Sequence, residues 1–562
     1  MSLYNKTVFI FFLVIFTTQS DAQSLKLRVL GEDDQKTKVI DSLGYQNDFI
    51  NYSKLQLEVE RLKNTLTQHG FIDTSIEDIV KKNDSLFEAN LILGQKINTV
   101  RIFFDKKFIN KYPNLIQTTT QNQYIDIKIE DLESHLLSLN SKIAEDGDPF
   151  STLQLTHLRK LEPDLISANI KVQSNQKRRI DNIIIKGYDK FPKAYIKHFL
   201  KLKTGNSFNL NTIKNKIDLL NDIRFASKIK DPEVLFTKDS TTLYLYIEKT
   251  KTNNFDGFLG FGTNEDTNRL EFDGYLDLRL VNNLNYGETL NLLYKSDEID
   301  QQTFKIDTDL PYLFSTPIGI QVGLNIFRKD STFLNANQYA KVNYQINNRH
   351  KIGIGITSTN STNLLENDTN TLNDYTTNYY TFEYNYIKSQ EHDLLFPINF
   401  WFNFSAGYGD RNTDISSEKQ NVFNLETFKI FNLNATNSIF AKLSGASLNS
   451  NDYLDNELFR FGGINSIRGF EENSLTADLY GVISTEYRYR LSSNIYINSV
   501  FDAAYLENSI NNAKEKLFGF GLGFGLLTNA GLFRFNYSSG KTENRAFKLS
   551  DSKVHVSLTA TF

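Results

Sequence analysis

The second half of the chain alternates apolar and polar residues with a period of two. In residues 518–526 large apolar residues alternate with glycine, and in residues 398–404 Ile and Phe alternate with Asn and Trp. This period predicts half-buried β-strands, because successive side chains point to opposite faces of a strand. Clusters of Asn, Asp, Ser and Gly separate the runs, as turns require. Residues 254–562 are therefore expected to form an all-β domain.

Sixteen candidate strands can be placed in this region, with boundaries open by about two to four residues. Each strand with its connection has about 19 residues, and about 10 suffice for a tilted strand to cross a membrane. An even number suits a closed antiparallel barrel, although fourteen and eighteen also fit the pattern. The predicted strands begin near Phe255, Asn268, Gly287, Gln301, Pro317, Thr332, His350, Asn378, Phe396, Lys419, Asn437, Leu479, Asn494, Lys516, Gly531 and Lys553.

The composition of the apolar face favours a membrane barrel over a soluble sandwich. The chain has 44 Phe and 28 Tyr, and in a sandwich so many bulky side chains would form an oversized core. In a membrane barrel the apolar face meets lipid, and aromatic residues collect near the two interfaces. The presence of a single Trp is the one departure from that pattern.

In the first half of the chain, strand and helix patterns recur three times in the same order. Strand-like runs open the copies at residues 25–31, 100–104 and 183–187. Helical stripes follow, and two further strand-like runs close each copy. The copies start near residues 25, 98 and 179, a spacing typical of small tandem domains rather than of solenoid repeats. Three unrelated α/β modules are the alternative, because the copies share little sequence identity.

This order resembles a row of POTRA domains, the β-α-α-β-β modules that lie in the periplasm below certain outer-membrane barrels. The order of the elements carries the resemblance. It implies POTRA-like domains at residues 23–97, 98–178 and 179–253, followed by a barrel at residues 254–562. The expected fold class is thus N-terminal α+β POTRA repeats followed by an all-β transmembrane β-barrel of sixteen antiparallel strands.

The N-terminus has the three parts of a secretory signal. Lys6 precedes an apolar run at residues 8–16, and the small residues Ser20 and Ala22 follow. The pattern predicts a signal peptide at residues 1–22, cleaved after Ala22. A short buried strand or a membrane anchor is the alternative, but the run is too short for a membrane helix, which needs about 20 residues.

A long connection, residues 451–478, lies between the eleventh and twelfth candidate strands. Within it, FRFGGINSIRGF at residues 459–470 resembles the F-x-x-G-G-x-x-S-[VI]-R-G-[FY] signature of the BamA/TamA-type outer-membrane assembly family. In that family the loop lies in the lumen of a sixteen-stranded barrel. Three POTRA units resemble the TamA-like branch most, while Ile464 and the turn at residues 529–531 depart from the family pattern and leave the branch open.

The resemblance also implies partners for the loop arginine, Arg468. The family places this arginine against acidic residues on the inner wall of the next two strands, which here are Glu486 and Asp502. Strand parity supports both positions, because each acid lies on the polar face of its predicted strand. A buried arginine needs such partners; a solvated charge cluster is the alternative. The loop residues of the motif are Gly462, Gly463, Arg468, Gly469 and Phe470, and the glycines are expected to let the backbone fold tightly against the wall.

The first and last candidate strands must meet to close the barrel. The last strand is amphipathic and ends in phenylalanine, which is similar to the recognition signal of outer-membrane barrels. The first strand contains three glycines, and glycine weakens strand packing. We expect this seam to be the weak point of the wall, and the resemblance implies that it opens for a client strand by β-augmentation. The seam residues are Gly257, Gly260, Gly262, Val554, Val556, Leu558 and Phe562.

Charge and residue content exclude several other classes. The chain has 62 basic and 66 acidic residues and no cysteine, so neither nucleic acid binding nor a thiolate site is expected. No G-x-S-x-G or H-E-x-x-H motif is present, and the seven histidines are scattered without metal-ligand spacing. We expect no enzymatic activity, no cofactor and no metal.

Three functions fit these features. The first is an assembly factor of the outer membrane, whose periplasmic POTRA domains receive unfolded outer-membrane or exported polypeptides, with periplasmic or outer-membrane accessory subunits as possible partners. The second is a two-partner secretion-type transporter of one exported polypeptide; that branch usually has two POTRA domains and a plug helix. The third is a non-transport scaffold in the outer membrane. In all three the barrel contacts the lipid bilayer.

Overall fold

The computed structural model describes residues 24–111, 124–173, 177–263, 270–296, 301–365, 371–390, 393–528, 531–543 and 552–561. The expected signal peptide at residues 1–22 and Phe562 lie outside these ranges. The chain divides into two compact units, one of Met1–Arg179 with Ser207–Leu210 and one of Ile180–Asn206 with Asn211–Phe562. None of the helices in the described ranges is long and apolar enough to cross a membrane.

The first unit contains two α/β domains with the same sheet order. In each sheet the first and last strands of the domain are parallel to each other and lie in the centre. The strand orders are β2-β1-β4-β3 and β6-β5-β8-β7. The first domain comprises β1 (Leu25–Leu30), α2 (Asp34–Leu43), β2 (Asp48–Phe49), α3 (Tyr52–Gln68), β3 (Ser75–Lys81) and β4 (Leu86–Ile92). The second comprises β5 (Thr99–Phe103), α4 (Lys106–Lys111), β6 (Tyr124–Lys128), the 3-10 helix η1 (Ile129–Asp131), α5 (Leu132–Glu145), β7 (Thr152–Glu162) and β8 (Leu165–Gln173).

The apolar stripe of α3 forms the core of the first domain. Leu55, Val59, Leu62 and Leu66 are all fully buried against the sheet, as their helical spacing predicts. The helix ends before Gly70, which has a φ of +101° and whose carbonyl accepts the N–H of Ile97 at 2.8 Å. The same arrangement recurs after α5, where the carbonyl of Gly147 accepts the N–H of Arg178 at 2.7 Å.

The second unit begins with a third α/β domain. Its sheet order is β10-β11-β9, with β9 parallel to β11. The short strands β2 and β6 of the first two domains, which the sequence pattern missed, have no counterpart among the described residues of this domain. Its elements are β9 (Asn182–Lys186), α6 (Lys193–His198), α7 (Leu210–Asp218), the 3-10 helix η2 (Leu219–Asp222), β10 (Ala226–Phe236) and β11 (Thr241–Lys249).

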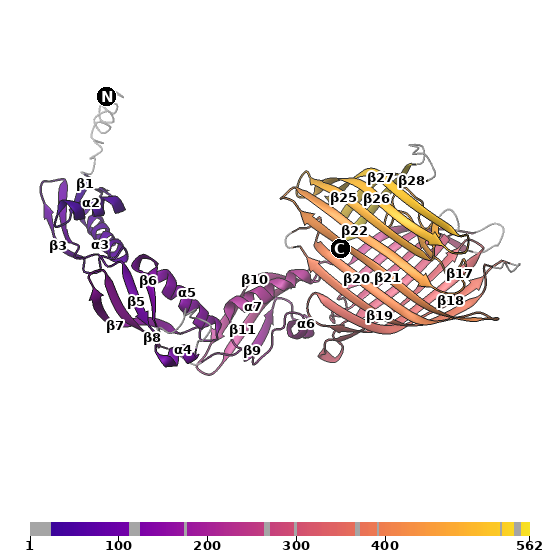
Figure 1. Cartoon of the computed structure of the whole chain (residues 1–562), viewed down its shortest axis with the longest axis horizontal. Coiled ribbons are helices and arrows are strands. Elements are labelled where there is room, and N and C mark those ends of the chain that lie inside the picture. The colour runs from indigo at the N-terminus through magenta and orange to yellow at the C-terminus, as the bar shows by residue number, and fades with distance from the viewer. Residues whose placement is uncertain are drawn as a thin grey trace, which may run out of the picture. The chain divides into compact units, whose positions relative to one another are not determined.

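Sixteen antiparallel strands then close into a barrel in chain order (Figure 1). Each begins within about three residues of its predicted position, so the predicted fold class is confirmed. The strands are β12 (Asn254–Thr263), β13 (Leu270–Val281), β14 (Thr289–Ser296), β15 (Gln301–Leu310), β16 (Ile318–Lys329), β17 (Phe333–Gln345), β18 (His350–Asn363), β19 (Tyr375–Ser389), β20 (Ile398–Asn412), β21 (Ser417–Asn432), β22 (Asn437–Asn449), β25 (Leu479–Arg490), β26 (Ile495–Asn508), β27 (Ala513–Thr528), β28 (Gly531–Thr542) and β29 (Ser552–Thr561). A 3-10 turn, η3 (Leu313–Ser315), precedes β16.

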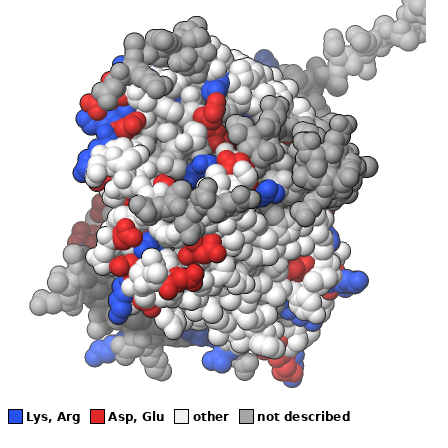
Figure 2. All heavy atoms as spheres, turned by 90° about the vertical axis from the view of Figure 1, so that its right-hand side faces the viewer, with Lys and Arg blue, Asp and Glu red and all other residues white. Residues whose placement is uncertain are grey.

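The outer wall of the barrel is apolar and exposed. Ile354, Tyr380 and Leu522 are 66 %, 76 % and 69 % exposed, although they lie in the middle of strands. Figure 2 shows both kinds of charged side chain on one end of the unit, and beside them a broad area with few charges. Exposed apolar surface of this extent marks contact with a membrane or a partner.

Aromatic side chains of the third domain pack against two turns of the barrel. Tyr188 accepts a hydrogen bond from Asn282 at 2.8 Å, and the Tyr195 hydroxyl donates to the Gly287 carbonyl at 3.2 Å. The Tyr195 ring meets the ring of Tyr312 edge-on, with the centroids 4.8 Å apart. Tyr195 is buried between the third domain and these turns. Its contacts therefore fix the third domain to the barrel.

Two glycines with similar backbone conformations test this joint. Gly287 has a φ of +80°, and a Cβ there would lie 2.2 Å from the Tyr195 ring; Gly205 has a φ of +85°, but no atom lies within 4 Å of its Cβ position. Alanine strains the backbone by about 1 kcal/mol at either site. Only Gly287→Ala must also displace Tyr195. We expect hydrogen exchange in α6 to rise at least about tenfold in Gly287→Ala and to stay near wild type in Gly205→Ala; equal exchange in both variants would contradict this joint.

Candidate functional site

The connection between β22 and β25 folds inside the barrel as a compact loop. It contains a hairpin of β23 (Phe459–Phe461) and β24 (Leu475–Ala477). Its apolar residues Phe461, Ile467 and Ala477 are buried in one cluster with wall residues of β25 to β27. The Phe461 ring stacks on the Tyr480 ring with the centroids 4.3 Å apart. The hairpin therefore packs against the inner wall.

Arg468 lies at the tip of this loop and contacts both predicted acids. Its Nε and Nη2 donate to the two carboxylate oxygens of Asp502 at 2.8 and 2.6 Å, and its backbone N–H donates to Asp502 Oδ2 at 2.9 Å. Its Nη1 donates to Glu486. Arg468 and Glu486 are buried, and Asp502 is fully buried. The structure thus brings together the three residues that the family resemblance and strand parity had paired.

The charge of this cluster is balanced by a second arginine. Arg488 Nε donates to the other carboxylate oxygen of Glu486 at 2.7 Å, and its guanidinium lies 4.0 Å from the ring centroid of Phe440. Burial opposes the charged form of Arg468, but its bonds to Asp502 and Glu486 outweigh that effect and raise its pKa. The cluster is therefore a paired, desolvated network of the kind that is costly to break.

Glycines let the loop tip touch the backbone of the wall. Gly469 has a φ of +90°, and a Cβ there would lie 2.4 Å from the Gly540 nitrogen of β28. A Cβ at Gly519 of β27 would lie 2.3 Å from the Arg468 carbonyl oxygen. The prediction that all three motif glycines meet the wall is wrong for two of them. Gly462 and Gly463 instead contact residues 471–474 of the same loop, because they precede the loop tip and lie beside the segment that follows it.

The loop tip also reaches the last strand. Phe470 packs against the buried cluster and lies close to Gly540. Glu471 accepts from Lys553 of β29 at 2.8 Å. The loop tip therefore touches the last five strands of the barrel in succession. The contact residues are Glu486 of β25, Asp502 of β26, Gly519 of β27, Gly540 of β28 and Lys553 of β29.

The base of the loop is held by a second set of contacts, which sequence reasoning missed. Arg411 of β20, 1 % exposed, donates to Glu457 at 2.6 Å, and Gln420 of β21 donates to the same carboxylate at 3.0 Å. Burial raises the pKa of Glu457, against the opposing effect of these two partners. Arg411 lies in a polar run of its strand, so the sequence pattern does not distinguish it from its neighbours. Only its buried position in the structure identifies it as an anchor of the loop.

Asn456 extends this anchor to three more strands. Its carbonyl accepts from Asn335 of β17 at 2.7 Å and from the Tyr375 hydroxyl of β19 at 3.1 Å. Its side-chain amide donates to Ser361 of β18 at 2.7 Å. The loop therefore runs from β17–β21 at its base to β25–β29 at its tip, as a strap across the lumen.

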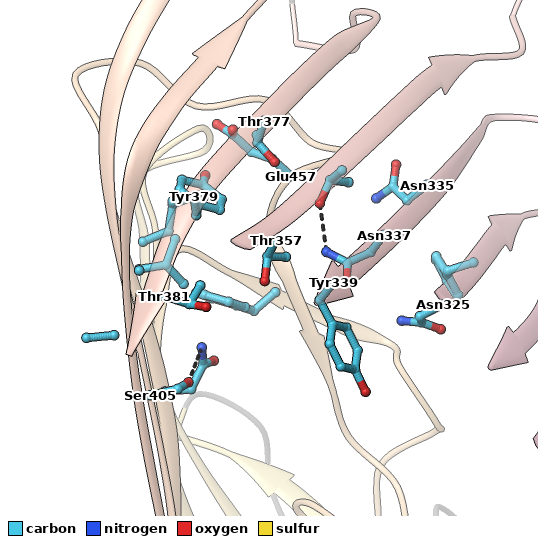
Figure 3. Close-up of a pocket in the computed structure, with 18 of the residues that line it drawn as sticks. Asn325, Asn335, Asn337, Tyr339, Thr357, Thr377, Tyr379, Thr381, Ser405 and Glu457 are labelled. Carbon is cyan, nitrogen blue, oxygen red and sulfur yellow. Dashed lines mark hydrogen bonds between the residues drawn. The ribbon is translucent and has the colours of Figure 1, made fainter. Parts of the chain in front are cut away.

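A polar cavity of about 470 Å³ lies beside the strap base (Figure 3). Figure 3 shows Asn, Thr and Tyr side chains of β16 to β19 around it, with Glu457 at its edge. On its wall, Asn337 of β17 donates to Thr359, its partner on the neighbouring strand β18, at 2.8 Å. The wall here presents mostly uncharged hydrogen-bonding side chains, with Lys341 and Glu457 as the charged residues of the lining, whereas the strap tip is a cluster of charged side chains.

Among the described residues, the seam between β12 and β29 is the shortest ladder in the barrel. Within these residues the two strands pair only at Asn254 with Thr561 and at Phe255 with Ala560, whereas β12 pairs with β13 along its whole length, Gly260 and Gly262 included. Gly257 has a φ of +151°, a backbone conformation that other residues rarely adopt. Val554 and Val556 of β29 face outward and are exposed, and Leu558 pairs with Phe533 of β28.

Comparison with known proteins gives structural likeness only. No protein-family model matches the sequence, and no curated protein matches it. Among solved structures, BamA from Haemophilus ducreyi lacking POTRA domains 1–3 is 14 % identical with a TM-score of 0.51, covering 83 % of this chain and 100 % of that chain.

Two further structures are similar over more of the chain. CdiB from Acinetobacter baumannii is 16 % identical with a TM-score of 0.51, and CdiB from Escherichia coli is 12 % identical with a TM-score of 0.53. Each match covers 91 % of this chain and 97 % of the other. At these identities the likeness shows a shared fold of tandem α/β domains and a barrel.

Removing the arginine at the strap tip should free the tip. Arg468→Ala leaves two buried carboxylates with one partner between them, which costs about 3–5 kcal/mol. We expect the barrel still to form, as judged by heat-modifiable gel migration, while residues 462–471 become accessible to protease. The double reversal Glu486→Lys with Asp502→Lys should behave in the same way. Lys553→Ala, which removes only a half-exposed pair, should keep the loop protected. Protection of the loop in Arg468→Ala would show that Arg468 does not hold the strap tip.

The base anchor can be tested separately from the tip. Arg411→Met leaves Glu457 buried without its cation, so we expect hydrogen exchange at residues 452–461 to rise while residues 466–470 stay protected. Glu457→Gln should restore much of the protection when combined with Arg411→Met, because the pair is then neutral and the double-mutant cycle is non-additive. Additive effects, or an equal loss of protection at the tip, would show that the base is not an independent anchor.

Proposed function

We propose that this protein is an outer-membrane assembly or translocation factor of the BamA/TamA type. In this proposal the three α/β domains are POTRA domains in the periplasm and receive unfolded client polypeptides. The barrel then inserts or translocates these clients at the seam between β12 and β29. The three α/β domains favour a layout like that of the TamA branch, and the likeness of the fold to BamA and CdiB structures supports the general class.

The short seam is the observation that carries this proposal. A backbone hydrogen bond contributes about 1 kcal/mol net, so a ladder of two residue pairs costs little to open compared with any other ladder of the wall. Opening exposes unpaired N–H and C=O groups on β12 and β29, which are a template for an incoming strand. A client β-strand has the complementary groups.

The outer wall supports the membrane location. Large apolar side chains on the outward positions of the strands are exposed, and alternate positions face a polar, strap-filled lumen. This is the arrangement expected of a barrel surrounded by lipid. We further propose that the protein acts by positioning strands and not by catalysing a reaction.

A disulfide across the seam tests this proposal. The chain has no cysteine, so the pair Phe255→Cys with Ala560→Cys, at backbone positions that face each other, is the sole thiol pair. The matched control is Val322→Cys with Ala340→Cys, which face each other between β16 and β17. We expect the oxidised seam variant to lose function and to regain it on reduction, with the control active throughout.

Quantitative proteomics of outer-membrane fractions is the readout. Loss of many unrelated barrels in the oxidised seam variant would support a general assembly factor. Loss of one exported or surface protein, with other barrels unchanged, would point to a dedicated transporter. An unchanged proteome with a fully oxidised seam would refute a function that needs the seam to open.

A further inference from the structure

The turns at the end where the chain enters the barrel carry exposed apolar residues. Seven turns lie at this end, and six of them are described apart from residues 391–392. Each of the six presents at least one large apolar side chain to solvent. These residues, here called the rim residues, are Leu284 and Tyr286, each 68 % exposed, Phe314 at 96 %, Ile346 at 44 %, Leu394 at 79 %, Leu433 at 58 % and Leu491 at 57 %.

Folding of the turns does not explain these side chains. Three of the turns have the same backbone pattern, in which the N–H groups of Ile346, Leu433 and Leu491 donate to the carbonyl four residues later, at 2.9 to 3.0 Å. The backbone makes these bonds, so a polar residue would form the same turn. An exposed large apolar side chain at the same place in each turn therefore indicates contact with something outside the chain.

The most exposed rim residue stands on a strained turn. Tyr312, Phe314 and Ser315 all have a positive φ of 52° to 56°, which costs free energy in residues other than glycine. His198 and Tyr195 of the third domain hold this turn from one side, while Phe314 stays 96 % exposed. Strain of this kind persists where a side chain is held in place for a function.

The distribution of the rim residues distinguishes a bilayer from a protein partner. The six turns follow β13, β15, β17, β19, β21 and β25, so the rim residues surround almost the whole barrel. A protein partner would cover one sector, whereas a bilayer meets every side of a barrel equally. The rim is also continuous with the exposed apolar outer wall. At the opposite end such residues are fewer among the described turns: Ile415 lies in one of the three short turns described completely, and Leu364 and Leu365, 40 % and 39 % exposed, begin the loop after β18.

We propose that the rim residues insert into the interfacial layer of the leaflet that surrounds this end of the barrel, and so anchor the barrel at a fixed depth. This rests on the proposed function only in that the barrel spans a membrane. Apolar and aromatic side chains gain free energy at a membrane interface, where turn backbones can still meet headgroups and water. The anchor would hold the third domain, which grips two of these turns, at a constant distance from the lipid.

Tryptophan fluorescence in liposomes tests this anchor. The chain has one Trp, Trp401, which packs on Phe428 of the neighbouring strand, so Trp401→Phe gives a silent background. Leu433→Trp and Leu491→Trp then report two separate turns of the rim. Leu522→Trp reports the outer wall, and Ile415→Trp reports the opposite end. The full chain is reconstituted into phosphatidylcholine vesicles, with or without bromine at carbons 6 and 7 of the acyl chain, and is also titrated with iodide.

We expect brominated lipid to quench Leu433→Trp and Leu491→Trp at least about threefold more than Ile415→Trp, and iodide to show the reverse order. If brominated lipid quenches Leu522→Trp while iodide quenches both rim variants as strongly as Ile415→Trp, the rim lies in water and the anchor is refuted, although the membrane barrel stands. If brominated lipid fails to quench Leu522→Trp as well, the membrane-spanning barrel itself is refuted. Quenching of only one rim variant would also overturn an anchor that surrounds the barrel.

Discussion

The desolvation of one guanidinium sets the arrangement of the barrel interior. Arg468 is buried in the lumen, and an unpaired charge there would cost several kcal/mol. Its two partners lie on adjacent strands, Glu486 on β25 and Asp502 on β26. The pairing is satisfied only when these strands keep their register and the loop tip reaches a single depth. Apolar contact on the outside of the barrel is non-directional and does not fix the geometry of the wall. The polar interaction of Arg468 inside the barrel therefore determines that geometry.

The consequence of this pairing is an asymmetric seam. The strap tip touches β25 to β29, through Glu486, Asp502, Gly519, Gly540 and Lys553, so the last five strands are tied to one another from inside. On the other side of the seam, β12 meets β29 at only two pairs of described residues. The side that the loop ties is thus the C-terminal one, and β12 is held mainly by β13.

Periodicity and motif were sufficient for most of the fold but not for the whole strap. The period of two placed all sixteen strands, because each strand has one apolar face on the outside of the barrel and one face toward the lumen. Strand parity and the family resemblance together paired Arg468 with Glu486 and Asp502. The Arg411–Glu457 contact joins residues 46 positions apart, from a strand and a loop whose packing no local pattern encodes. The sequence shows that one face of residues 518–526 consists of glycine. It does not show why, because the Arg468 carbonyl approaches Gly519 only once the loop has folded.

The strap also bears on which route a client would take. Passage of a polypeptide through the lumen would require displacement of the strap, which means breaking the Arg468 cluster, the Arg411–Glu457 pair and the contacts of Asn456. Two of these sets leave buried charges unpaired, at several kcal/mol each. Sideways opening of the seam breaks two residue pairs and leaves every strap contact with β25 to β29 intact. If the protein has the proposed function, this difference in free energy favours insertion of a client at the seam over its passage through the pore, unless the client supplies new partners for Arg468 and Glu457.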